Sequence, residues 1–199
     1  MMNNIRKMDL EDLSFVVDIH LAAFMGFFLS SMGKQFLREF YNSVLLDETH
    51  IAFVCQNKVN ILGFVAGTTQ PFGFYKHAVK RRWWRFAFSA LMPALKNPLI
   101  VPRLLRAIRK PKDVLCQPNR GTLMSIAVVP EAQGQGIGQV LVETFLEEAA
   151  KRGLKQIDLT TDKNNNDRVN QFYRSIGFRC LRTFSTPEGR EMNEYIIDI

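Results

Sequence analysis

The sequence predicts one mixed α/β domain in which a central, partly antiparallel sheet is flanked by helices. Its 199 residues fit a single domain with one elaboration. A hydrophobic fraction of 47% and a charged fraction of 23% are typical of a globular protein. Apolar spacing alternates along the chain between strand-like runs and helical stripes. We therefore expect one domain over residues 1–199, with residues 72–119 forming a basic helical insert before the strand that leads into a glycine-rich turn.

The N-terminal third is expected to form a strand, two amphipathic helices and a hairpin. Acidic residues follow the first apolar run, which suits the start of a helix. Apolar residues then recur every three or four positions, while two later apolar runs flank a short polar turn. The predicted elements are a strand at 3–8, a helix at 11–25, a second helix capped by Ser30 or Ser31, and antiparallel strands at 51–55 and 61–69.

The C-terminal part is expected to alternate strands with helices. Within 137–151 apolar residues recur every four positions, which indicates a helix, and Gly153 suits its end. A strand, a glycine turn, a helix and another strand in succession predict a parallel crossover. The predicted elements are strands at 121–129, 155–161, 178–184 and 194–199, with a short helix at 167–175 that ends at Gly177.

The positive charge of the chain is concentrated in one segment. Between residues 76 and 120 there are 12 basic residues and one acidic residue, a net charge of +11. The whole chain carries +7, so the remainder carries 7 − 11 = −4. No DNA-recognition motif accompanies this charge, and we expect no duplex nucleic acid as a partner. Two interpretations of the insert remain open. It is either a structural arm with a solvated basic face, or a functional segment. In the functional interpretation, residues 76–112 contact an anionic surface such as a membrane, or the segment binds a phosphate-bearing acceptor.

Neither a metal site nor a disulfide framework is expected. The three cysteines are widely spaced and form no C-x-x-C pair. Acidic residues interrupt the first twenty positions, which breaks a signal-peptide core, and no apolar run reaches the roughly 18 residues of a membrane span. We therefore expect a cytoplasmic location.

A glycine-rich turn between a strand and a helix carries the clearest chemical signal. Glycines stand at alternate positions, 134, 136 and 138, directly before the predicted helix. Such glycines let the backbone approach a ligand closely, and the unpaired amides and dipole at a helix start attract an anion. The spacing differs from the dinucleotide fingerprint, and no G-K-[ST] follows for a nucleotide-binding P-loop. The turn alone is also compatible with a merely tight connection.

A second motif makes this pattern specific. Gln133, Gly136 and Gly138 are followed by Asn166-x-x-Val169-x-x-Phe172-Tyr173-x-x-x-Gly177-Phe178. The two motifs in this order, together with the order of elements, resemble the GNAT superfamily of acetyl-CoA-dependent N-acetyltransferases. Only residues 72–119 lie outside the resemblance. It implies acetyl-CoA as co-substrate and no metal.

The resemblance also implies roles for individual residues. The strand before the turn would pair with the pantetheine arm through Ile126, Ala127 and Val128. The amides of the turn would hold the pyrophosphate, Asn166 would line the arm, and Tyr173 would protonate the leaving thiolate. Without the motif, Tyr173 would equally well be a packed aromatic residue. The turn residues are Gln133, Gly134, Gln135, Gly136, Ile137, Gly138 and Gln139.

The expected reaction is direct attack of a primary amine on the thioester. We expect a small-molecule acceptor, and the charged insert favours an anionic one such as a nucleotide-linked amino sugar. A protein or peptide amine, and a non-catalytic acyl-CoA-binding module, are the alternatives, and a homodimer is left open. No acidic residue lies in 121–129 to act as general base, so the choice stays open among Glu131, His20, Glu39, Tyr41 and a water chain that ends at Ser125 or a backbone carbonyl.

Overall fold

One seven-stranded sheet organises the molecule. The computed structural model describes residues 4–71, 84–91, 93, 95, 102 and 119–199. The strands lie in the order β1-β2-β3-β4-β5-β7-β6, and every neighbouring pair is antiparallel except β4 with β5. Their bounds are β1 Asn4–Lys7, β2 His50–Gln56, β3 Ile61–Thr68, β4 Arg120–Val128, β5 Gln156–Asp162, β6 Arg179–Ser185 and β7 Glu191–Asp198. The predicted fold class, hairpin and parallel crossover are confirmed.

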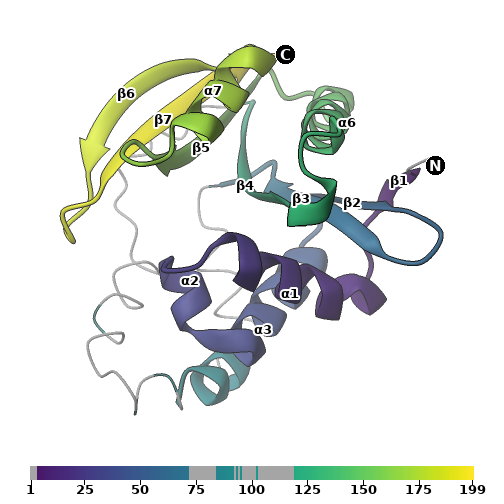
Figure 1. Ribbon diagram of the computed structural model, residues 1–199, viewed down its shortest axis with the longest axis vertical. Coiled ribbons are helices and arrows are strands. Elements are labelled where there is room, and N and C mark those ends of the chain that lie inside the picture. Colours follow the sequence, from purple (N-terminus) through teal and green to yellow (C-terminus); the bar gives the residue numbers. More distant parts are fainter. Residues whose placement is uncertain (1–3, 72–83, 92, 94, 96–101, 103–118) are drawn as a thin grey trace.

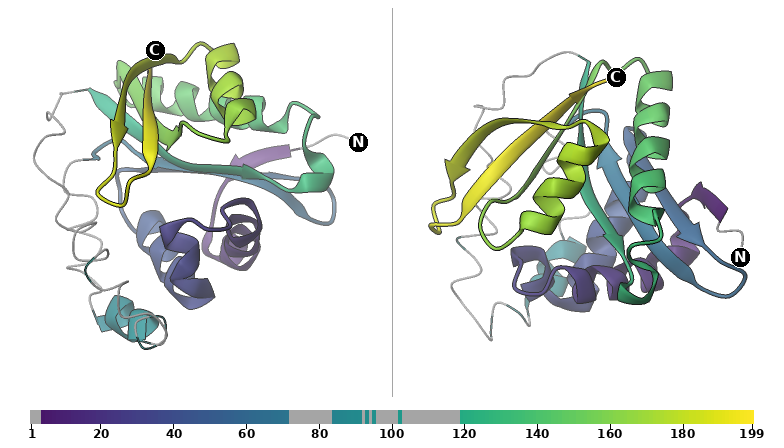
Figure 2. Two further views of the ribbon diagram at one scale, coloured as in Figure 1. Left: turned by 60° about the vertical axis from the view of Figure 1, so that its left-hand side comes forward. Right: turned by 45° about the horizontal axis from the view of Figure 1, so that its top comes forward.

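Helices cover both faces of this sheet, as the left view of Figure 2 shows. The apolar faces of α1 and α3 form one core cluster with the strands, and those of α6 and α7 form a second cluster on the other face. This arrangement buries both faces of β2 and β3, which explains their nearly continuous apolar runs. The helices are α1 Leu13–Ala23, α2 Phe28–Ser31, α3 Gly33–Leu45, α6 Ile137–Lys151 and α7 Asp167–Ile176, with short 3₁₀ turns η1 Leu10–Asp12 and η2 Pro130–Ala132.

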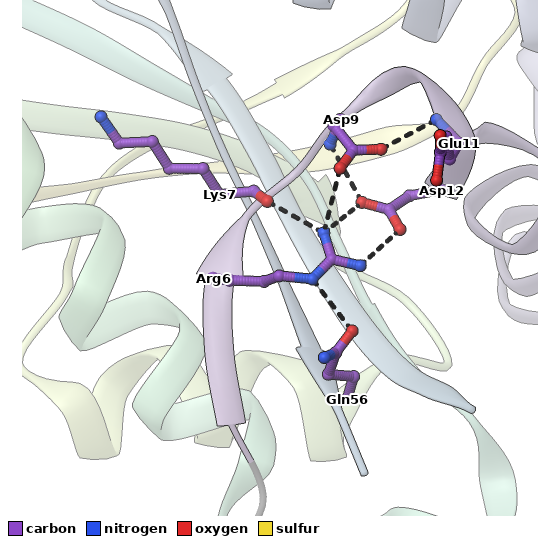
Figure 3. Close-up of polar contacts among 6 residues, drawn as sticks. All are labelled: Arg6, Lys7, Asp9, Glu11, Asp12 and Gln56. Carbon is purple, nitrogen blue, oxygen red and sulfur yellow. Dashed lines mark hydrogen bonds and ion pairs between the residues drawn. The ribbon is translucent and has the colours of Figure 1, made fainter. Parts of the chain in front are cut away.

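The N-terminal strand is fixed by a half-buried ion pair (Figure 3). Arg6 donates to both carboxylate oxygens of Asp12 at 2.7 Å and to the side chain of Gln56 at 2.9 Å. Burial would raise the pKa of Asp12, but the hydrogen bonds from Arg6 and from the Asp9 amide outweigh it, so the pKa lies below its ordinary value. Asp12 therefore stays ionised and holds β1 and β2 to the start of α1.

The second predicted helix differs from the expectation at its start. Ser30 and Ser31 do not cap it, because both lie inside α2, and Ser31 donates its hydroxyl proton to the Phe28 carbonyl at 2.6 Å. The cap position of α3 is Met32, which has no side-chain oxygen to accept a hydrogen bond. A turn at Met32 separates the two helices instead, and Gly33, the first residue of α3, adopts a positive φ of 81°.

Most of the predicted insert, residues 72–119, lies outside the described residues. Within it, residues 84–91 are helical, as expected. Phe86 and Ala90 are buried in the core cluster of α1 and α3, and the rings of Phe86 and Phe36 lie 5.3 Å apart in an edge-to-face contact. Among the described helices, none is both long and apolar enough to span a membrane.

Candidate acyl-donor site

The sheet separates into two parts between β4 and β5. These strands pair only where Arg120, Gly121 and Thr122 face Gln156, Ile157 and Asp158. Beyond that point β4 continues along β3 as far as Val128, and β5 continues along β7 as far as Asp162. Figure 1 shows β5, β7 and β6 diverging from β1 to β4. We call the space between the two diverging strands the wedge, and the three-residue pairing at its closed end the seam.

The predicted strand residues line this wedge. Ile126, Ala127 and Val128 are the last residues of β4, and they pair on the other side with Val65, Phe64 and Gly63 of β3. Their edge toward β5 therefore has no ladder partner among the described strands. An extended ligand can add to such an edge through main-chain hydrogen bonds.

A register shift interrupts β4 within the wedge. Ser125 faces Ala66 and Leu123 faces Gly67, so Met124 is an extra residue between them. A bulge of this kind re-aims backbone groups locally. A backbone amide freed at a bulge suits a developing oxyanion, and Met124 marks where the bulge occurs.

The glycine turn follows β4 at the open end of the wedge. Gly134 and Gly136 adopt φ angles of +77° and +78°, the left-handed region in which a side chain is strained. A Cβ atom added at either position would meet no heavy atom within 4 Å. The backbone at both glycines is thus exposed to a ligand rather than packed against protein.

The amides of this turn have no acceptors. The first backbone hydrogen bond of α6 is donated by the Val140 amide to the Gly136 carbonyl at 3.1 Å. For residues 134–139, none of the backbone N–H groups donates to an acceptor in the described part of the chain. The first turn of α6 also contains no acidic residue. Six successive free donors at the positive end of a 15-residue helix form a site for an anion.

The remaining residues of the turn support its shape. Gln133 and Gln135 donate from their side chains to the carbonyls of Val128 and Glu131, both at 3.2 Å. Ile137 is buried in the core, whereas Gln139 is exposed and donates to Glu143 at 2.9 Å. These contacts tie the turn to β4 and α6 and leave its backbone donors open.

Helix α7 brings the second motif beside the turn. A Cβ atom added to Gly138 would lie 3.3 Å from the Phe172 ring, so the glycine lets α6 and α7 approach closely. Asn166 precedes α7 and donates to the Thr161 hydroxyl at 2.8 Å and to the Asp162 carbonyl at 3.1 Å. The Asn166 amide group therefore secures the connection from β5 to α7.

Sequence reasoning missed Asn170, which lies one helical turn after Asn166. Its side chain is buried, donates to the carbonyls of Asp162 and Asn166, and accepts from Asn193 at 3.0 Å and Tyr195 at 3.0 Å. This network ties α7 to β7. The signal was present in the sequence, because Asn166, Asn170 and Tyr173 share one helix face at spacings of four and three residues.

Tyr173 is packed among aromatic rings. Its ring centroid lies 5.3 Å from that of Phe172, 5.7 Å from Phe178 and 6.0 Å from Tyr195. Burial raises the pKa of its phenol well above the ordinary value. Tyr173 is therefore protonated at neutral pH, and its hydroxyl donates to no other described residue. Both the proton-donor role and the packing role predicted for it are compatible with this geometry.

The residues considered as a general base lie in different places. His20 and Tyr41 are buried between α1 and α3, with His20 Nδ1 2.7 Å from the Tyr41 hydroxyl, and burial lowers the pKa of His20 to about 4. Glu39 binds Arg85 at 3.4 Å. Glu131 is exposed in η2, and Ser125 is buried on β4. Apart from His20, Tyr41 and Glu39 on α1 and α3, the candidates lie on separate elements, and no base is assigned.

A contact of Arg190 links the β5-β7-β6 part of the sheet to the connection between α1 and α2. Arg190, just before β7, donates to Asp162 at the end of β5 at 2.7 Å. Its guanidinium also lies 4.6 Å from the centroid of the Phe27 ring, between α1 and α2. The wedge is thus bordered by the glycine turn on the α6 face and by this contact on the α1 face.

A polar cavity of about 710 Å³ lies elsewhere, beside α7 and the β6–β7 hairpin. It contains none of the turn residues from Gln133 to Gln139. Among the described residues, no group of three or more His, Cys, Asp or Glu side chains is placed to hold a metal ion.

Comparisons with known proteins agree with this architecture. The [ribosomal protein bS18]-alanine N-acetyltransferase of Escherichia coli K12 is 35% identical over 77 residues, which are 37% of this chain and 51% of that protein. The chain spans about half the length of the curated relatives it matches.

Two solved structures share the fold. An acetyltransferase of the GNAT family from Desulfovibrio desulfuricans aligns with a TM-score of 0.66 at 13% identity, covering 99% of each chain. An aminoglycoside 6'-N-acetyltransferase complexed with coenzyme A aligns with a TM-score of 0.64 at 13% identity, covering 98% of this chain and 96% of that one. The model of the acetyltransferase (GNAT) family matches residues 13–178, which include the wedge, the turn and Tyr173. The chain therefore belongs to the GNAT acetyltransferase family.

Proposed function

We propose that this chain transfers an acetyl group from acetyl-CoA to a primary amine by direct attack on the thioester, in the cytoplasm. The observation that carries the proposal is the row of six acceptor-free amides from Gly134 to Gln139 at the start of α6. Family membership supports the same reaction class. Acetyl-CoA supplies the activated acyl group.

The residues of the chain have complementary tasks in this reaction. The turn amides fit a pyrophosphate, because they offer successive donors at the positive end of a helix. The free edge of β4 at Ile126, Ala127 and Val128 positions the pantetheine arm of acetyl-CoA. Asn166 orders the β5 side of the wedge, opposite this edge. Holding donor and amine together accounts for much of the rate of such direct transfers. The Tyr173 hydroxyl, which is kept protonated by burial, donates a proton to the departing sulfur.

The acceptor is proposed to be a small-molecule amine, with an anionic molecule such as a nucleotide-linked amino sugar favoured by the basic segment. The similar proteins include an aminoglycoside 6'-N-acetyltransferase and a ribosomal-protein-alanine N-acetyltransferase. A protein or peptide amine is therefore the second candidate. A panel of amino sugars, nucleotide-linked amino sugars, polyamines and short peptides, with release of the coenzyme thiol as readout, tests the proposal. Thermal stabilisation by CoA without turnover on any amine would indicate a binding module instead.

Replacing Tyr173 by Phe separates its two roles. We expect turnover to fall by roughly 10- to 1,000-fold, while the Kd for CoA stays within about twofold, because only the proton to the leaving group is lost. Because burial raises the pKa of Tyr173, the phenol stays protonated at pH values above the ordinary pKa of a tyrosine. The kcat of the wild type should therefore show no alkaline decline from this group below about pH 10. Equal turnover of both enzymes, with chemistry rate-limiting, would assign Tyr173 to packing alone.

A further inference from the structure

The helix at residues 84–91 presents an apolar stripe to solvent. Trp84, Phe88 and Leu91 are 51%, 75% and 53% exposed, and Leu95 farther along the chain is 71% exposed. Their spacing of four, three and four residues places them on one helix face. Four of the twelve large exposed apolar side chains of the described residues thus lie within twelve positions of sequence.

The opposite face of this helix is already occupied. Phe86, Ser89 and Ala90 are 6%, 8% and 8% exposed, and Phe86 packs on Phe36 of α3. Arg85 binds Glu39 of α3 and lies 4.9 Å from the centroid of the Trp84 ring. The stripe is therefore held outward by a packed inner face, and it can meet a partner without any part of the core unfolding.

The charge of the surrounding sequence identifies the kind of partner. Twelve basic residues and one acidic residue lie between positions 76 and 120, whereas the rest of the chain carries −4. An apolar helix face containing Trp, Phe and Leu, set within a stretch of sequence rich in Lys and Arg, is typical of binding in the plane of a membrane interface. The Trp ring prefers the headgroup level, and the cations attract anionic lipids.

A second copy of the chain is a poorer match. A symmetric dimer pairs the same patch on both subunits, so it would bring two segments of charge +11 together. We infer that the stripe of Trp84, Phe88, Leu91 and Leu95 docks the protein on an anionic lipid surface. This inference is independent of the proposed acetyl transfer, and it concerns a surface contact, since no described helix is able to span a membrane.

Vesicle binding tests the inference with the full chain. We expect cosedimentation with vesicles of 30% phosphatidylglycerol in phosphatidylcholine at 0.1 M NaCl, and little with phosphatidylcholine alone or at 0.5 M NaCl, because salt screens the attraction. The two tryptophans of the chain are Trp83 and Trp84, so their emission reports on this segment directly. It should shift to shorter wavelength on binding.

Matched variants distinguish binding through the stripe from non-specific hydrophobic binding. Phe88→Ser with Leu91→Ser should lower partitioning to anionic vesicles by at least about tenfold and abolish the emission shift, since two exposed apolar anchors are lost. The control is Met25→Ser with Val59→Ser, which removes two apolar side chains that are 80% and 82% exposed elsewhere. The control should bind as the wild type does.

A second pair of variants tests the charge. Arg81→Gln with Arg82→Gln should weaken binding and reduce its salt dependence more than Lys58→Gln with Lys155→Gln, which removes the same charge elsewhere. Equal binding to neutral and anionic vesicles, no binding to either, or equal losses in test and control variants would overturn the inference. A change of sedimentation coefficient without vesicles in the Phe88→Ser, Leu91→Ser variant would also overturn it and assign the stripe to self-association.

Discussion

The glycines of β3 and those of the turn before α6 serve opposite purposes. A Cβ atom added to Gly67 would lie 2.3 Å from the Thr122 carbonyl oxygen and 2.6 Å from the Phe145 ring. A Cβ atom added to Gly136 would contact nothing within 4 Å. Gly67 is required because protein fills the space beside it, whereas Gly136 is required by its positive φ and borders empty space. Two identical residues thus mark a packed region and a binding region, and four substitutions distinguish them.

The largest effect is expected at the crowded position. Gly67→Ala places a methyl group against the backbone of β4, which cannot rotate away, and against a fully buried ring. We expect the free energy of unfolding to fall by about 3 kcal/mol or more, at or above the usual range for overpacking. Urea denaturation measures the loss. A loss below about 1 kcal/mol would show that β3 and β4 can separate at this point.

A smaller stability effect but a specific binding effect is expected at the open position. Gly136→Val forces a β-branched residue into a positive φ, which costs about 1–3 kcal/mol. Its side chain also occupies the space in front of the free amides. We expect the CoA affinity measured by calorimetry to fall about 100-fold or more, because several charge-assisted hydrogen bonds are lost.

Gly153 at the other end of α6 provides the matched control. Its φ is +82°, and a Cβ atom there would also meet nothing within 4 Å. Gly153→Val should therefore cost similar stability and leave CoA affinity within about twofold, because it lies at the negative end of the helix. Equal losses of affinity in both variants would mean that strain in α6 is responsible, and the anion site would then have to be placed elsewhere.

The smallest effect is expected at Gly138, which lies between the two classes. A Cβ atom there would be 3.3 Å from the Phe172 ring, a contact that a small ring shift relieves. Alanine is favoured over glycine in a helix by about 1 kcal/mol, so Gly138→Ala should change the stability by less than that amount. In a Phe172→Leu background the same substitution should become more stabilising, and a double-mutant cycle measures this coupling. A coupling of zero would show that the two helices do not depend on this approach.

The order of elements and the turn were predictable because both are local. Apolar periodicity fixes strands and helices residue by residue, and three alternate glycines before a helix identify the turn from the sequence itself. The start of β7 was not predictable: the strand begins at Glu191 rather than at residue 194, because its polar first residues are held by pairing with β5 and β6.

The arrangement of the site depends on contacts that no local pattern encodes. The seam closes at Thr122 and Asp158, 36 residues apart, and the contact of Arg190 with Phe27 joins segments from opposite ends of the chain. The spacing of Asn170 marks its helix face, but its partners Asn193 and Tyr195 are defined only when α7 is placed on β7. The acceptor side was least predictable, since His20, Glu39 and Tyr41 acquire their partners only through the packing of α1, α3 and residues 84–91.

The seam gives the backbone a distinctive pattern of isotope exchange. On β4 beyond Thr122, alternate amides face β3 and the others face the wedge, where no described strand accepts them. Deuterium uptake in the free protein should therefore alternate between slow and fast along residues 125–128, beyond the bulge at Met124, while the amides of β3, which has partners on both sides, stay uniformly slow. A ligand that completes the missing ladder would make β4 exchange as slowly as β3. The time course of labelling would thus record occupancy of the wedge without any catalytic assay.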